Sequence, residues 1–214
     1  MSQIRLGLFD LFGYIIPGIV IIIFMGLALN VVDIAQLQAL VSGLTLVSSI
    51  AYIFLGYVVG FITEGLAIRY VSLILDRVRG DLGNRVFIKF SEIHPDAKLK
   101  NFDINYIYSF VAVNSPGSIE KADTFFALGS LARNLSFAFL LFGATSLVRY
   151  IILGNTILWL YGISILALLL SIYLVFQADN FRGRSHRHLL NIYYVINEAS
   201  IKSKEGKSGL QKKS

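Results

Sequence analysis

The stretch between Asp10 and Asp33 most constrains what this chain can fold into, because its 22 residues include no ionisable side chain except one tyrosine. A secretory signal peptide fits this stretch poorly, since Arg5 alone precedes it, the apolar run is too long, and no A-x-A-like cleavage pattern closes it. A helix needs about 20 apolar residues to cross the hydrocarbon core of a bilayer. Residues 12–32 supply 21, so we predict a retained membrane span.

Three more uncharged stretches follow, of 30, 15 and 29 residues. They predict spans at about residues 40–63, 134–153 and 156–176. Gly154-Asn155 is a good turn pair, so we expect the third and fourth spans to form an antiparallel hairpin. Only 15% of the residues are charged, whereas a soluble domain has about 25%. The predicted fold is therefore all-α, an integral membrane four-helix bundle in which residues 1–63 and 134–176 hold the spans.

The distribution of basic residues predicts the orientation of these spans. The two links between the spans of each pair contain one Lys or Arg in total, Arg149, and the rest of the chain contains 18. Short loops rich in Lys and Arg stay in the cytoplasm. We therefore expect a multi-pass protein of the bacterial inner membrane, with both termini and the middle region cytoplasmic.

The middle region, residues 64–133, mixes nine basic with eight acidic residues, which is typical of the surface of a small folded element. We expect a cytoplasmic helical element into which the second, third and fourth membrane helices extend. Within it, residues 103–114 have apolar side chains at helical spacing after Asp103, a plausible N-cap. Residues 85–90 fit a short strand and a helical turn equally well.

After the fourth span, residues 177–201 predict a basic amphipathic cytoplasmic helix. Its arginines, Arg182, Arg184 and Arg187, are candidates for a surface that contacts membrane lipids or a protein partner. Residues 202–214 are polar and rich in lysine, with Gly and Ser, and predict a disordered basic tail.

Small residues at helical spacing predict where helices approach closely in lipid. Gly56 and Gly60 form a GxxxG in the second span. The other candidate packing residues are Gly18, Gly26, Ser136 and Ala144. These residues fit packing among the four helices of one chain, and they also fit contact in a homo-oligomer.

Two further features are a charged pair near the predicted cytoplasmic boundary of the membrane and a proline inside the first predicted span. Glu64 and Arg133 either form an interfacial ion pair or are ordinary flanking charges. Pro17 either kinks the first helix or marks its true start, since proline has no N–H to donate.

The sequence contains no pattern that predicts chemistry. No ionisable residue lies in the middle of a span, so proton or ion coupling is not expected. There is no cysteine, and His186 and His188 are spaced for opposite sides of a helix, where they cannot bind one metal. Catalytic and nucleotide-binding motifs are missing. We therefore predict no enzyme activity, no catalytic residue, no cofactor and no metal, and we do not expect nucleic acid as a direct partner.

Three segments, FDLFGYIIPG (9–18), YIFLGYVVGFITE (52–64) and LARNLSFAFLLF (131–142), occur in this order. The series resembles a group of small bacterial four-span membrane proteins with both termini inside. Some of these are encoded beside phage-defence genes, and the membrane subunit of Kiwa-type two-gene systems has a comparable size and layout. The resemblance implies a role in defence and carries no catalytic residue.

Two functions fit these expectations. The first is a non-enzymatic, oligomeric platform or sensor in the membrane that docks a cytosolic protein. The second is a pore-forming effector whose oligomer depolarises the membrane.

Overall fold

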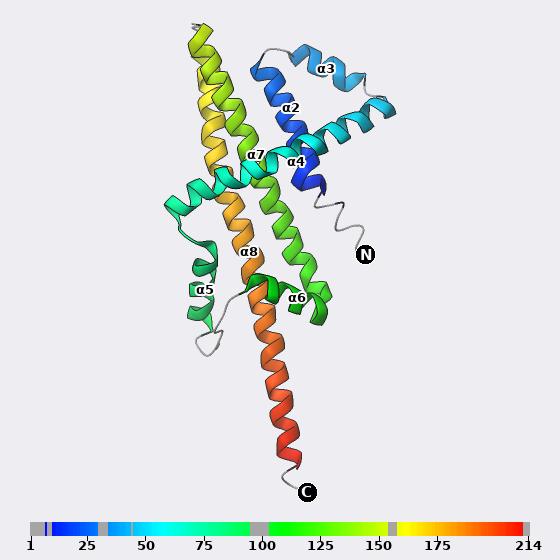
Figure 1. The fold of residues 1–214 in the computed structure, drawn as a ribbon, viewed down its shortest axis with the longest axis vertical. Helices are drawn as coiled ribbons and strands as arrows, with labels where there is room; N and C mark the ends of the chain where they lie inside the picture. The colour runs from blue at the N-terminus through cyan, green and yellow to red at the C-terminus, as the bar shows by residue number, and fades with distance from the viewer. Residues whose placement is uncertain are drawn as a thin grey trace. The chain divides into compact units, whose positions relative to one another are not determined.

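The structure, a computed structural model, describes residue 7 and residues 10–29, 34–43, 45–94, 103–153 and 158–211. Within these ranges the regular elements are all helical and no strand is present, so the predicted all-α fold is confirmed (Figure 1). The chain divides into two compact units. Unit 1 comprises Met1–Arg79 and Ala127–Asn180, and unit 2 comprises Gly80–Phe126 and Phe181–Ser214.

The helices follow one another with short connections. In chain order they are the π-helical turn η1 (Leu11–Ile15), α2 (Ile16–Ala28), α3 (Ile34–Ser42), α4 (Leu46–Val78), α5 (Leu82–Ile93), α6 (Ile104–Asn114), α7 (Pro116–Leu153) and α8 (Leu158–Gln211).

Four helical segments are long and apolar enough to cross a membrane, and they correspond to the four predicted spans. They are Leu11–Ala28, Leu46–Val78, Pro116–Ile152 and Tyr161–Asn197. The predicted turn at residues 154–155 lies outside the described residues.

The predicted boundaries of the first two spans are wrong. The first predicted span ran to residue 32, but α2 ends at Ala28. The second was predicted from residue 40, but α4 begins at Leu46 because Thr45 and Ser48 form a capping box. The Thr45 hydroxyl accepts from the N–H of Ser48 at 3.3 Å, and the Ser48 hydroxyl accepts from the N–H of Thr45 at 2.8 Å. This reciprocal pair starts a new helix, so residues 34–42 form the separate helix α3.

Helix α4 continues without interruption beyond the second predicted span, as expected from the sequence. It ends at Val78, and Gly80 follows with a φ of 67°. Residues with a side chain rarely adopt this left-handed conformation, which glycine adopts readily. The glycine therefore allows the chain to turn away and begin α5.

In unit 2, a carboxylate starts each of the two short helices. Asp81 caps α5 by accepting the backbone N–H of Asn84 at 2.8 Å, and Asp103 caps α6 by accepting that of Asn105 at 2.9 Å. The helix predicted after Asp103 is confirmed. Residues 85–90, which the sequence left open, belong to α5 and are helical.

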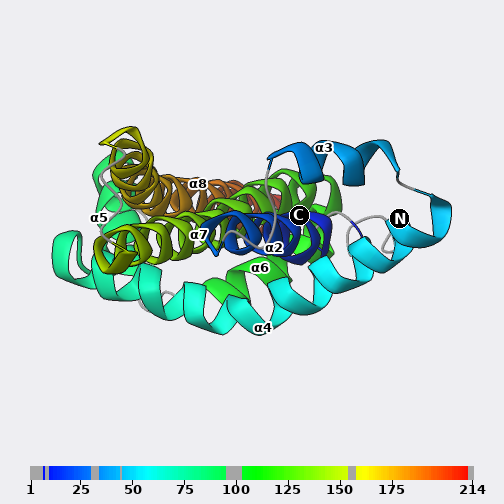
Figure 2. The same cartoon turned by 90° about the horizontal axis from the view of Figure 1, so that it is seen from above.

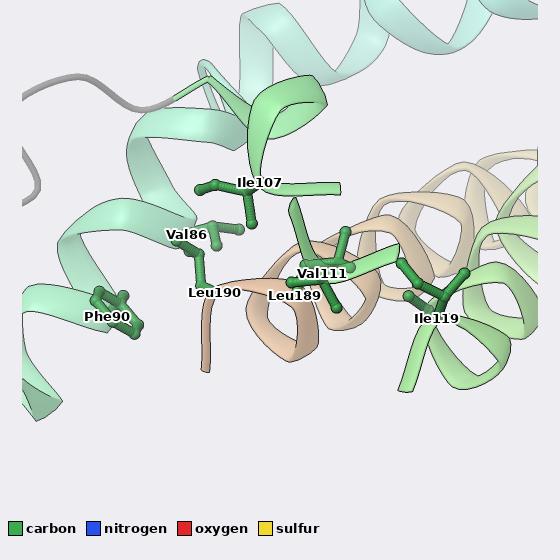
Figure 3. Close-up of a cluster of buried hydrophobic side chains, with 8 residues drawn as sticks. Val86, Phe90, Ile107, Val111, Ile119, Leu189 and Leu190 are labelled. Atoms are coloured by element: carbon green, nitrogen blue, oxygen red, sulfur yellow. The ribbon is translucent and has the colours of Figure 1, made fainter. Parts of the chain in front are cut away.

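The core of unit 2 is a cluster of buried apolar side chains from four helices (Figure 3). It contains Val86 and Phe90 of α5, Ile107 and Val111 of α6, Ile119 and Ala122 of α7, and Leu189 and Leu190 of α8. The apolar stripe predicted after residue 177 is thus occupied by α5, α6 and α7, and does not need a lipid surface to cover it.

The C-terminal part of the chain differs from the prediction. Helix α8 is one element from the fourth span to Gln211, so it includes the predicted amphipathic helix 177–201 and also residues 202–211, which were predicted to be disordered. Extending a helix adds one hydrogen bond for each residue fixed, whereas nucleation is costly. A polar segment without proline can therefore continue a helix that it would not start. Residues 212–214 lie outside the described part of the chain.

Candidate functional site

In unit 1, η1 and α2 pack against α4 (Figures 1 and 2), and three of the predicted glycines lie in close contact there. A Cβ atom on Gly18 would lie 1.8 Å from the carbonyl oxygen of Gly56, and one on Gly60 would lie 2.1 Å from that of Tyr14. On Gly56, a Cβ atom would lie 2.6 Å from Cγ1 of Ile19. The GxxxG motif is therefore used inside this chain and does not offer a free face to a second copy.

Pro17 leaves a backbone acceptor that a distant side chain uses. Proline cannot donate to the carbonyl four residues earlier, which here is that of Gly13. The side-chain amide of Asn134 on α7 donates to this carbonyl, and both Gly13 and Asn134 are buried. Pro17 is the second residue of α2, directly after η1, so it marks the start of that helix. In hydrocarbon a carbonyl freed by proline must be satisfied by a neighbouring helix, and Asn134 does this.

The predicted pair of Glu64 and Arg133 is present in unit 1. A guanidinium nitrogen of Arg133 lies 2.7 Å from a carboxylate oxygen of Glu64, and the two side chains are only 10% and 21% exposed. The Tyr14 hydroxyl also hydrogen-bonds Glu64, and Nε of Arg133 donates to the Asn134 side chain at 3.3 Å. Removing one partner from a largely buried pair strands the other charge, so this contact ties α4 firmly to α7.

A second polar contact lies further along α4. The hydroxyl of Tyr70 lies 2.8 Å from that of Ser171 on α8, and the Ser171 hydroxyl donates to the backbone carbonyl of Ser136 on α7 at 2.6 Å. Ser136 and Ser171 are fully buried. Two hydrogen bonds thus connect α4, α8 and α7 in series.

The third contact joins the end of α4 to α8. Arg79 donates to Asp179 at 2.8 Å and to Asn180 at 3.3 Å, and its guanidinium lies 4.6 Å from the ring centre of Phe176. The Asp179 side chain is 2% exposed. We name three contacts together the α4 clamp: Glu64 with Arg133, Tyr70 with Ser171, and Arg79 with Asp179. Sequence reasoning found only the first, because nothing in the sequence links residues about 100 positions apart.

Helices α7 and α8 carry small residues at a spacing of seven. They are Ala122, Gly129, Ser136 and Gly143 on α7, and Ser164, Ser171, Ala178 and Ser185 on α8, and all eight are buried. In unit 1 the Ser171 hydroxyl donates to the carbonyl of Ser136, and in unit 2 the Ser185 hydroxyl donates to that of Ala122 at 3.0 Å. A sustained period of seven is typical of supercoiled helix pairs. We did not predict this repeat, although its spacing is visible in the sequence.

The seven-residue period explains why one predicted packing residue, Ala144, is not buried within the chain. Ala144 is exposed, whereas Gly143 beside it is buried, and a Cβ atom on Gly143 would lie 2.8 Å from Leu168 on α8. Gly143 follows Ser136 by seven residues and shares its face. Ala144 follows Ser136 by eight, which turns it about 80° further around a helix of 3.6 residues per turn. Gly26, also predicted, is half-buried in α2.

The three arginines at the start of the basic segment do not form one surface. Arg184 and Arg187 are exposed and lie three residues apart on one side of α8, whereas Arg182 is half-buried. Residues two apart on a helix point to nearly opposite sides, which separates Arg182 from Arg184. Arg184 lies over the ring of Phe181 at 5.8 Å, and Nε of Arg187 donates to the carbonyl of Gly183 at 3.2 Å.

Arg149 has a role inside unit 1. Its guanidinium donates to the carbonyl of Ala28 at 2.9 Å, and Ala28 is the last residue of α2. The final carbonyls of a helix have no partner within the helix and carry a partial negative charge. Arg149 therefore caps the end of α2 and holds it against α7.

The candidate site is thus a set of packing and polar contacts in unit 1. Among the described residues, no three His, Asp or Glu side chains gather as metal ligands would. No protein family, curated protein or solved structure matches the chain.

Proposed function

We propose that this chain is a non-enzymatic, multi-pass protein of the bacterial inner membrane that acts as a platform or sensor for a cytosolic protein. The α4 clamp is the observation that carries this proposal. It joins α4 to both α7 and α8 through three polar contacts, each with one buried partner, and buried polar groups are rare in spans and costly to separate. In line with the resemblance described above, we place this role in defence against phage.

The two sides of α4 suit a sensor. One side carries the clamp and the glycine contacts, while large apolar residues such as Ile50, Phe54 and Phe61 are exposed and available to lipid. Glu64 and Arg79 are 15 residues apart, which is about 22 Å along the helix. A change in the bilayer that moves α4 would therefore act on α7 and α8 at contacts that are well separated along α4.

Helices α7 and α8 each contribute residues to unit 1 and to unit 2. The core of unit 2 includes side chains from both. We propose that unit 2 presents the surface for the partner, and that copies of the chain associate through the exposed apolar side of α4, since Gly56 and Gly60 are occupied within the chain.

A labelling experiment tests the orientation on which this function depends. The chain has no cysteine, so single cysteines can be introduced at Gln38 in α3 and at Val113 in α6, which are both exposed. In intact spheroplasts, a membrane-impermeant maleimide should label Gln38→Cys and should reach Val113→Cys only after permeabilisation. Labelling of Val113→Cys in intact spheroplasts would contradict the proposal.

A second experiment separates a platform from a pore. Expression of the chain should leave the membrane potential unchanged, as read by a potential-sensitive dye, and the tagged chain should co-purify with one stoichiometric cytosolic protein. Arg79→Gln breaks one clamp contact and should reduce co-purification, whereas Arg77→Gln alters an exposed arginine of the same helix and should not. Loss of the potential on expression would instead support the pore-forming effector.

A further inference from the structure

One side of α8 in unit 2 is covered by the core and the other is open. Leu189 and Leu190 are buried in the core, and Tyr193 packs on the rings of Tyr106 and Phe110. Arg184 precedes Tyr193 by nine residues, about two and a half helical turns, and so points the opposite way. Four exposed residues share this open side, which we name the outer face of α8: Arg184, Arg187, Asn191 and Val195.

Neither arginine of the outer face forms an ion pair with an acidic side chain of the described residues. Their contacts are with the Phe181 ring and the Gly183 carbonyl. In unit 1, by contrast, Arg79 and Arg133 both pair with carboxylates. The outer face therefore presents two guanidinium groups that remain available to carboxylates of another molecule.

The net charge of the chain is concentrated in the same segment. Residues 181–214 contain eight basic and two acidic residues, a net charge of +6, and the remaining eleven basic and eleven acidic residues balance each other. This local excess favours an acidic partner and speeds its encounter with the segment.

The residues that accompany the two arginines favour a protein as that partner. Anionic lipid headgroups and carboxylates both bind guanidinium groups. The outer face adds Val195, an apolar side chain that is 62% exposed and lies in line with the arginines. An amphipathic protein helix offers charge and apolar contact together at helical spacing, so this combination favours a protein over a lipid surface.

From these observations, and resting on the proposed function, we infer that the outer face of α8 docks an acidic amphipathic helix of the cytosolic partner. Carboxylates of that helix bind Arg184 and Arg187, and an apolar side chain packs on Val195. Residues three and four positions apart share one face of a helix, and the four residues of the outer face follow this spacing, so a helix lying along α8 can contact all of them.

The test uses the full chain in nanodiscs of phosphatidylcholine and a fluorescent 14-residue helical peptide with Glu and Leu on one face. Arg184→Gln with Arg187→Gln should weaken binding roughly five- to tenfold, since exposed ion pairs contribute up to about 1 kcal/mol each. Val195→Ser should weaken binding about fivefold through lost apolar burial. Arg77→Gln and Val113→Ser, at exposed positions away from the outer face, should change it less than about twofold.

Three results would overturn the inference. Equal weakening by Arg77→Gln would mean that binding reflects general attraction of a polyanion. Arginine-dependent binding to vesicles of phosphatidylglycerol, with no peptide binding, would mean that the face contacts lipid. If the arginine variant misfolds, as judged by circular dichroism, the effect of Val195→Ser on peptide binding tests the inference in its place. The cytosolic partner can also still co-purify with the Val195→Ser chain while the peptide binds neither this variant nor the natural chain. That result would contradict only this docking face and would leave the proposed platform function unaffected.

Discussion

The contact between Asn134 and the carbonyl of Gly13 predicts a measurable coupling between Asn134 and Pro17. Asn134→Leu removes the donor and leaves a buried carbonyl without its partner. In membrane proteins such interhelical hydrogen bonds contribute about 0.6 kcal/mol on average and up to about 1.7 kcal/mol. Pro17→Ala restores a backbone N–H that can serve the same carbonyl. Asn134→Leu should therefore cost less in the Pro17→Ala background than in the natural chain.

The four proteins of this double-mutant cycle should be unfolded with SDS in mixed micelles. The cycle subtracts the cavity that Pro17→Ala leaves, and also the loss of the contact between Asn134 and Arg133. We expect an interaction free energy of about 0.6 to 1.7 kcal/mol. A value below about 0.3 kcal/mol, the usual limit of additivity, would refute the idea that Asn134 compensates for the proline.

Three further predictions concern stability, measured by the same unfolding assay. Gly60→Ala should cost about 1–3 kcal/mol because the new Cβ atom meets the backbone of another segment. The control Gly65→Ala should not destabilise the protein, since its Cβ atom meets nothing within 4 Å, and equal losses in the two variants would contradict the close contact at Gly60. Glu64→Ala should cost about 3 kcal/mol because the largely buried Arg133 loses its carboxylate partner, and replacing both residues by leucine should recover part of this loss; a double variant as unstable as Glu64→Ala would contradict the idea that the lost charge pair is the cause. Tyr70→Phe should cost about 0.6 kcal/mol, and a loss above about 2 kcal/mol would mean that its hydroxyl has further partners.

Local patterns along the chain predicted the local features of the structure. The four candidate spans follow from apolar runs, since in hydrocarbon only a helix can satisfy the backbone of a single spanning segment. The cap at Asp103 and the end of α4 before Gly80 also follow from neighbouring residues. The start of α4 was missed, although the capping pair Thr45 and Ser48 is a local signal that the sequence contains.

The packing residues were predicted only in part. Spacing identified Gly18, Gly56 and Gly60, because close helix contact in lipid requires small residues. The same reasoning does not give a buried position at Ala144, since a spacing of four drifts around the helix whereas a spacing of seven keeps nearly the same face.

By itself, the sequence determined which four helical stretches are long and apolar enough to cross a membrane, because hydropathy depends only on which residues follow one another. Tertiary structure decided which polar groups meet. Asn134 serves the carbonyl of Gly13, and Arg79 binds Asp179, across separations of 121 and 100 residues. Such pairs depend on how the helices cross and rotate against each other, which is a property of the packed helices and not of any single segment.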